Sequence, residues 1–140
     1  MTATQRVFIA CDDLFFRVNL EARVRSVNLE PVGVDTLEAV NAALSAGAPR
    51  AAFVDLHLRG DQAVPIVERL SNAKPGMPVI CFGSHVDQDL LDRARRAGGV
   101  ALPRSRFVRE FPSLLAKLGV GTLTTSLQDP SAPVRPEKPE

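Results

Sequence analysis

Five short apolar runs, each followed by a stretch with helical periodicity, are the feature that most limits how this chain can fold. The runs are mostly unbroken rather than alternating, which is typical of parallel strands covered by helices on both faces. They lie at 6–11, 30–34, 51–54, 79–82 and 100–102. With short loops and right-handed crossovers, the pattern predicts an α/β fold with an open, doubly wound, five-stranded parallel sheet.

The stretches between the runs predict one helix each. The first begins after Asp13, a plausible N-cap, and Asp35 or Thr36 is expected to cap the second. The last stretch, 107–118, has the most regular apolar stripe in the chain, and we expect it to be core rather than interface. In the first helix the stripe consists of Phe16, Leu20, Val24 and Val27.

The 140 residues divide into a predicted domain, 1–118, and a predicted flexible Pro-rich tail, 119–140. The tail's four prolines recur every third residue, which also suits a polyproline II ligand for a partner, although a solvated tail is the commoner case. We expect no DNA-binding or enzymatic output domain in this length, so output would occur by protein contact.

Composition excludes several classes of function. The net charge of +1 gives no field that would recruit nucleic acid or a membrane surface, and the absence of Tyr and Trp argues against a base-stacking surface. The N-terminal apolar run is too short for a signal peptide or a membrane span. Cys11 and Cys81 form no disulfide framework, so we expect buried, reduced thiols in a cytoplasmic protein.

Polar residues follow the predicted strands at their carboxyl ends, where open parallel sheets place their functional crevice. Asp12 and Asp13 follow the first strand, Asp55 the third, Ser84 the fourth and Arg104 the fifth. Neighbouring carboxylates repel one another unless a cation lies among them, and all-oxygen ligation suits Mg²⁺. A metal ion beside one free carboxylate suits phosphoryl transfer, because the metal neutralises the phosphate charge and the carboxylate acts as the nucleophile.

At these positions the chain resembles the receiver domain of two-component response regulators, which has a flavodoxin-like (βα)5 fold. The likeness covers roughly residues 5–118. The segments that carry it are 7–13, 53–60, 78–85 and 97–105.

The resemblance implies that Asp55 accepts a phosphoryl group from a histidine kinase or a phosphotransfer protein. It implies weakly bound Mg²⁺ on Asp12, Asp13, Asp55 and the backbone carbonyl of His57. Gly83, Ser84 and Arg104 would contact the phosphoryl group and report it to a downstream protein through the 87–118 face. A homodimer is compatible with this picture, and no catalytic residue or enzymatic activity is expected.

The departures from the family pattern concern the read-out residues. Gly83 stands where receivers have Thr or Ser, and Arg104 stands in place of their Lys. Ala101 replaces the strand-five aromatic, and Arg59 replaces a Pro after the acceptor. These differences favour an alternative, a pseudo-receiver that binds a partner without regulation by phosphorylation.

Other classes of function have weaker support. A Mg²⁺-dependent phosphatase usually has a second Asp two residues after its nucleophile, where this chain has His57. A flavin protein needs a phosphate-binding loop after the first strand, which is absent. A transition-metal site on His57, His85 and the aspartates is conceivable, but loop histidines are usually just exposed.

Overall fold

The computed structural model describes residues 5–118, and they form one five-stranded sheet flanked by helices. The predicted Pro-rich tail, 119–140, lies outside the described residues. In chain order the elements are β1 (Arg6–Ala10), α1 (Leu14–Ser26), β2 (Glu30–Gly33), α2 (Leu37–Leu44), β3 (Ala51–Asp55), a 3-10 turn η1 (Arg59–Asp61), α3 (Ala63–Ala73), β4 (Val79–Gly83), α4 (Gln88–Arg96), β5 (Val100–Pro103) and α5 (Arg104–Leu118).

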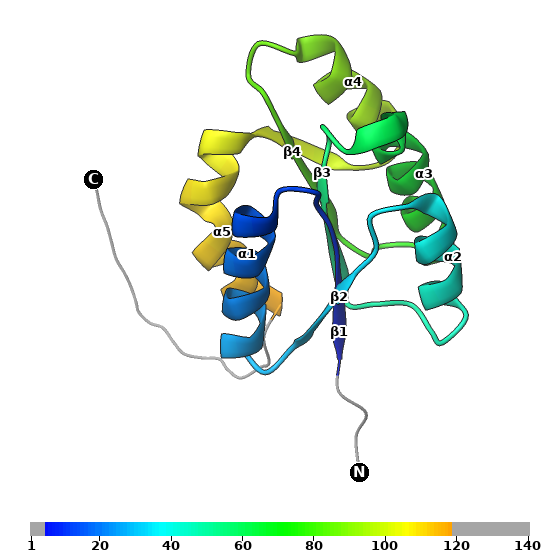
Figure 1. The fold of residues 1–140 in the computed structure, drawn as a ribbon, viewed down its shortest axis with the longest axis vertical. Coiled ribbons are helices and arrows are strands. Elements are labelled where there is room, and N and C mark those ends of the chain that lie inside the picture. Colours follow the sequence, from blue (N-terminus) through cyan, green and yellow to red (C-terminus); the bar gives the residue numbers. More distant parts are fainter. Residues whose placement is uncertain (1–4, 119–140) are drawn as a thin grey trace.

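The sheet has the strand order β2-β1-β3-β4-β5, and all four pairings are parallel. Helices α1 and α5 lie on one side of it, and α2, α3 and α4 lie on the other (Figure 1). This confirms the predicted doubly wound flavodoxin-like sheet. Strand β2, which carries Pro31, is at an edge, where a missing backbone donor is tolerated.

Two apolar clusters, one on each face, hold the layers together. The cluster under α1 and α5 contains Phe53, Phe82, Phe107 and Phe111, and Phe16 packs against it. The cluster under α2, α3 and α4 is aliphatic apart from Phe8. The apolar stripe of α5 is buried as predicted, because this helix must cover the β4–β5 side of the sheet.

The helix starts follow the predicted capping chemistry. Asp13 Oδ1 accepts from the backbone N–H of Phe16 at 3.1 Å, and Thr36, rather than Asp35, caps α2 by accepting from Ala39 N at 3.0 Å. Within residues 5–118, none of the helices combines the length and the apolar character needed to cross a membrane.

Candidate functional site at the carboxyl edge of the sheet

Four strands deliver polar residues to the same edge of the sheet. Asp12 and Asp13 lie in the loop after β1, and Asp55 is the last residue of β3. Gly83 ends β4 and is followed by Ser84, and Arg104 begins α5 directly after β5. The parallel arrangement therefore brings the predicted site residues to one end of the molecule.

Asp55 is buried, with 4% of its surface exposed. No other charged residue among residues 5–118 is buried. Its Oδ1 accepts from the backbone N–H of His57 at 2.9 Å. Its Oδ2 lies 3.4 Å from Arg104 Nη2 and 3.7 Å from the thiol of Cys11. A buried carboxylate is costly unless it is paired, so this residue is held at the end of β3 by specific partners.

Arg104 lies between two carboxylates and two aromatic rings. Its guanidinium nitrogens are 3.4 Å from Asp55 Oδ2 and 3.9 Å from Asp13 Oδ2. Its guanidinium carbon lies 4.3 Å from the ring centre of Phe16 and 5.6 Å from that of Phe82. A planar guanidinium can stack on an aromatic ring and at the same time donate hydrogen bonds from its edge, which a lysine ammonium cannot do.

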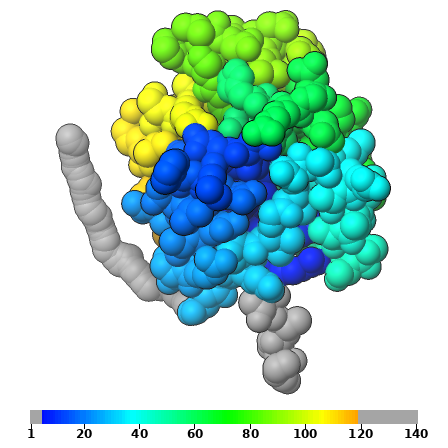
Figure 2. All heavy atoms as spheres, in the orientation of Figure 1, coloured from blue at the N-terminus to red at the C-terminus, as the bar shows by residue number. Residues whose placement is uncertain are grey.

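Asp12 is paired with a second arginine. Its Oδ2 accepts from the backbone N–H of Arg59 at 2.8 Å and lies 3.8 Å from Arg59 Nε. The contact joins the β1–α1 loop to the β3–α3 loop, and Figure 2 shows these two parts of the chain meeting on the surface below α4. Apart from the absence of the usual Pro at position 59, no pattern along the chain indicated this pair.

The carboxylates match Mg²⁺ in ligand chemistry but not in their arrangement. Arg104 and Arg59 supply the positive charge beside them, and one oxygen of Asp13 is used as the α1 cap. Nowhere in residues 5–118 are three His, Cys, Asp or Glu side chains grouped closely enough to hold a metal ion. In this structure Asp12 and Asp13 are thus engaged with arginines rather than gathered around a cation, and Mg²⁺ binding stays a prediction.

The hydrogen bonds of Ser84 go to His57 and Val86 rather than to Asp55. Its Oγ accepts from the backbone N–H of Val86 at 3.3 Å, within its own turn, while its backbone N–H donates to His57 Nε2 at 2.9 Å. A Cβ on Gly83 would lie 3.4 Å from that imidazole nitrogen and from Leu56, which is close to an ordinary van der Waals contact. The hydrogen bond to the His57 ring was missed from sequence, where the residue was considered only as a metal ligand, through its backbone carbonyl or its imidazole.

A series of hydrogen bonds leads from Asp55 to the start of α4. His57 donates to Asp55 through its backbone and accepts from Ser84 through its ring. The backbone N–H of Asp87 donates to the Ser84 carbonyl at 3.1 Å, and Asp87 Oδ1 caps α4 by accepting from Leu90 N at 3.3 Å. A cavity of about 280 Å³ lies beside this path, lined in part by His57, Asp87 and Leu90.

Both cysteines are buried, as predicted, Cys81 within β4 and Cys11 directly after the end of β1. Burial raises the pKa of the Cys11 thiol to about 12, although the contact with the backbone of Asp13 lowers it in part. Burial also raises the pKa of the Cys81 thiol to about 12. Because the thiolate is the reactive form, neither residue is suited to redox or nucleophilic chemistry near neutral pH.

The 87–118 face, predicted as a docking surface, has part of its charge neutralised internally. Arg95 pairs with Asp92 at 2.9 Å and also donates to the Ala101 carbonyl, and Arg106 pairs with Glu110 at 2.6 Å. The net positive charge of this face therefore falls mainly on other residues, among them Arg93, Arg96, Arg109 and Lys117.

Receiver domains of response regulators are among the solved structures that are similar in fold to this chain. The receiver domain of NtrX from Brucella abortus superposes with a TM-score of 0.63 at 18% identity, over 80% of this chain and 98% of that one. A CheY-like receiver domain protein from Methanospirillum hungatei has a TM-score of 0.65 at 16% identity, over 83% and 97%. A putative response regulator from Chloroflexus aurantiacus has a TM-score of 0.65 at 19% identity, over 81% and 99%.

The likeness is one of fold. This chain spans 28% of the longer NtrX chain, which it matches at 17% identity and a TM-score of 0.65 over 83% of its own length. No protein-family model and no curated protein matches the sequence. The chain thus has the receiver fold, and what it does must be argued from its own residues.

Proposed function

We propose that this chain is a receiver-like signalling module in which Asp55 accepts a phosphoryl group from a histidine kinase or a phosphotransfer protein. The observation that carries the proposal is the buried Asp55 carboxylate with Arg104 at 3.4 Å, at the carboxyl edge of a receiver fold. A buried, specifically paired carboxylate at the functional edge of such a sheet is more than a turn cap.

In the proposed reaction an oxygen of Asp55 attacks the phosphorus of a phosphohistidine. A new P–O bond forms, the P–N bond breaks, and the imidazole nitrogen keeps the bonding electron pair and takes up a proton from water. The Arg104 guanidinium, already beside Oδ2, can donate to the phosphoryl oxygens. The backbone N–H of His57 holds the other carboxylate oxygen in place.

Mg²⁺ is part of the proposal as a weakly bound cofactor that would neutralise phosphoryl charge. Its ligands would be Asp12, Asp13, Asp55 and the His57 carbonyl. For these oxygens to gather, Asp12 and Asp13 must give up contacts with Arg59 and Arg104. We therefore expect the metal to compete with the arginines.

The proposed output is a change at α4 that a partner protein reads. Receivers usually report through a hydroxyl and an aromatic, and here the corresponding residues are Gly83 and Ala101. The path through His57, Ser84 and Asp87 offers a different link, since a phosphoryl group on Asp55 would alter the first contact in it. The cavity of about 280 Å³ beside Asp87 and Leu90 gives the start of α4 room to shift.

The test is incubation of the full chain with acetyl phosphate, with and without Mg²⁺, followed by intact-mass measurement. We expect a gain of one phosphoryl group in the wild type and none in Asp55→Asn. Asp61→Asn is the matched control, because Asp61 is exposed in the neighbouring turn and Asn tolerates its φ of 53°. This control should be phosphorylated like the wild type.

Failure of the wild type to gain mass, while a known receiver does so in parallel, would overturn the proposal. The pseudo-receiver reading would then be preferred. The observation that favours it is that Asp12, Asp13 and Asp55 each already have an arginine partner. Such pairing is expected in a site that stays in one state without phosphorylation.

A further inference from the structure

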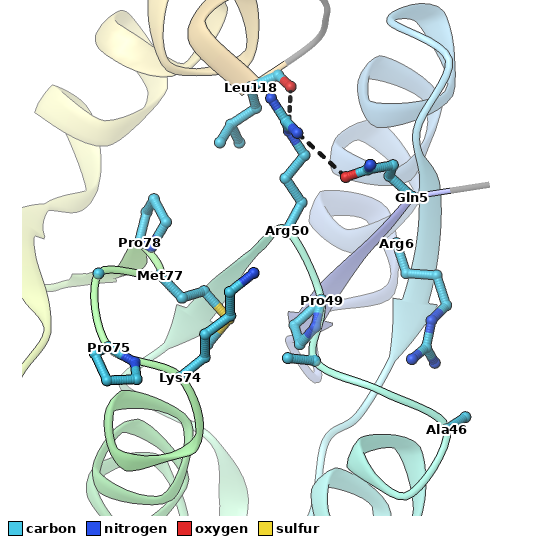
Figure 3. A pocket seen from close by; sticks show the side chains of 12 residues that line it. Gln5, Arg6, Ala46, Pro49, Arg50, Lys74, Pro75, Met77, Pro78 and Leu118 are labelled. Carbon is cyan, nitrogen blue, oxygen red and sulfur yellow. Dashed lines mark hydrogen bonds between the residues drawn. The ribbon is translucent and has the colours of Figure 1, made fainter. Parts of the chain in front are cut away.

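A further cavity of the described chain lies at the opposite edge of the sheet from Asp55. It has a volume of about 610 Å³, within the range of small-molecule sites. Its walls come from the start of β1, the α2–β3 loop, the α3–β4 loop and the end of α5. Figure 3 shows side chains from these segments surrounding one hollow.

The lining is positively charged. Arg6, Arg50 and Lys74 contribute three cations from three different segments, and the lining includes no Asp or Glu. The whole chain has a net charge of only +1, so this concentration of positive charge is local. A hollow lined by one sign of charge raises the concentration of the opposite ion within it.

The two arginines are held in place by groups of the protein. Arg50 donates from Nε to the Leu118 carbonyl at 2.6 Å and from Nη1 to Gln5 Oε1 at 3.2 Å. Arg6 donates from Nη2 to the Gly47 carbonyl at 2.7 Å. These bonds use only part of each guanidinium, which has five N–H donors, so the remaining donors can bind a ligand without the arginine having to be ordered first.

The third cation, Lys74, has no carboxylate paired with it among residues 5–118. In Figure 3 its side chain points into the space between the Arg50 segment and the Pro78 segment. Three prolines, Pro49, Pro75 and Pro78, stiffen the loops that carry the cations. The loops are thus restrained before any ligand binds.

We propose that this cavity binds a small phosphate-bearing molecule. Arginine forks and a lysine ammonium are the groups that bind phosphate oxygens in proteins, and three of them would balance a di- or trianion. Met77, Pro78 and Leu118 supply apolar surface beside the charges, which suits an organic body attached to the phosphate. The site is separate from Asp55 and does not depend on its phosphorylation.

The test is a ¹H–¹⁵N NMR titration of the full chain with two probes, inorganic pyrophosphate and adenosine monophosphate. Pyrophosphate supplies the anion alone, and the nucleotide adds a flat organic body. We expect saturable shifts at residues 46–50 and 74–77, with a Kd of about 1 mM or below. If the nucleotide binds more tightly than pyrophosphate for the same number of negative charges, the apolar wall contacts the organic part of the ligand. If the two probes bind equally tightly for the same charge, the cavity binds only the anion.

Lys74→Ala should weaken pyrophosphate binding at least about fivefold, the size expected for one charge-assisted contact. Lys117→Ala is the matched control, since it removes the same charge from an exposed position of α5 outside the cavity. Arg6→Gln should act like Lys74→Ala, so the result does not rest on one variant.

Three outcomes would overturn the site: absence of saturable shifts, equal weakening by Lys74→Ala and Lys117→Ala, or shifts confined to residues 83–87. The second of these would mean general charge attraction, and the third would mean that the anion binds at the carboxyl edge.

Discussion

The two faces of the sheet are packed in different ways. On the α1–α5 face the rings of Phe82 and Phe107 stack with centres 4.4 Å apart, and Phe53 and Phe111 meet edge-on at 5.1 Å. On the α2–α4 face the core is aliphatic, with Phe8 as its one aromatic side chain among the described residues.

The two faces contact the candidate site in different ways. The α1–α5 face, called the aromatic face below, supports Arg104, whereas the hydrogen bonds that lead from the site to α4 lie on the other face. Arg104, which binds Asp55, rests on Phe16 of the aromatic face. The hydrogen bonds from Asp55 to α4 run on the other face, beside the cavity of about 280 Å³. Ring contacts with defined geometry suit a fixed support, and an element beside free volume is easier to move.

The largest effect is expected at the centre of the aromatic face. Phe107 is fully buried and contacts the rings of Phe16, Phe53, Phe82 and Phe111. Phe107→Ala should lower the free energy of unfolding by about 3–5 kcal/mol, measured by urea denaturation, because it removes burial and leaves a cavity.

Two controls set the scale of that result. Val108→Ala, at a position 52% exposed, should change the stability by less than about 0.5 kcal/mol. Val67→Ala in the aliphatic core should lower it by about 2 kcal/mol. If Val67→Ala were as damaging as Phe107→Ala, the aromatic face would not be the more firmly held one.

A smaller effect is expected where the aromatic face meets the site. Arg104→Met leaves the buried Asp55 carboxylate without its guanidinium and removes the stacking on Phe16. Stability at pH 7 should fall by about 1–2 kcal/mol, less than for a fully buried pair because the Arg104 side chain is 41% exposed.

The matched control is Arg96→Met, an exposed arginine of α4, which should be close to neutral. Asp55→Asn made in the Arg104→Met background should recover part of the loss, since the unpaired charge is then gone. Equal stabilities of the two methionine variants would show that Arg104 is not a support for the site.

The smallest effect concerns the thiol buried on the aliphatic face. Burial raises the pKa of Cys81 from 9.0 to about 12, so above pH 9 the unfolded chain releases a proton that the folded chain keeps. Stability must therefore fall as pH rises through this range. Between pH 9 and pH 10 the wild type should lose about 1 kcal/mol more than Cys81→Ala, measured by urea unfolding. The same pH dependence in both proteins would mean that water reaches Cys81.

Much of the fold could be predicted because its signals are local. The apolar runs gave all five strands to within a residue or two, and Asp13 was recognised as a cap from its position before the first helix. The common edge for Asp12, Asp13 and Asp55 followed from the parallel topology alone, since strands of one direction end together.

The detail of the candidate site could not be predicted in the same way. Ser84 was considered for its hydroxyl, but the structure uses its backbone N–H, and the His57 ring appears as its acceptor. The pairing of Arg59 with Asp12 was not anticipated. Such contacts depend on side-chain directions in loops, where no periodicity constrains them.

By itself the sequence determined the layered sheet and the edge at which the carboxylates lie, because apolar spacing over a few residues decides which segments are strands and helices. Only the tertiary structure decided how the charges are paired. Arg104 and Asp55 are 49 residues apart, and their contact depends on where Phe16 and Phe82 support the guanidinium. A pattern along the chain carries no information on the distance between two such side chains until the strands are packed side by side.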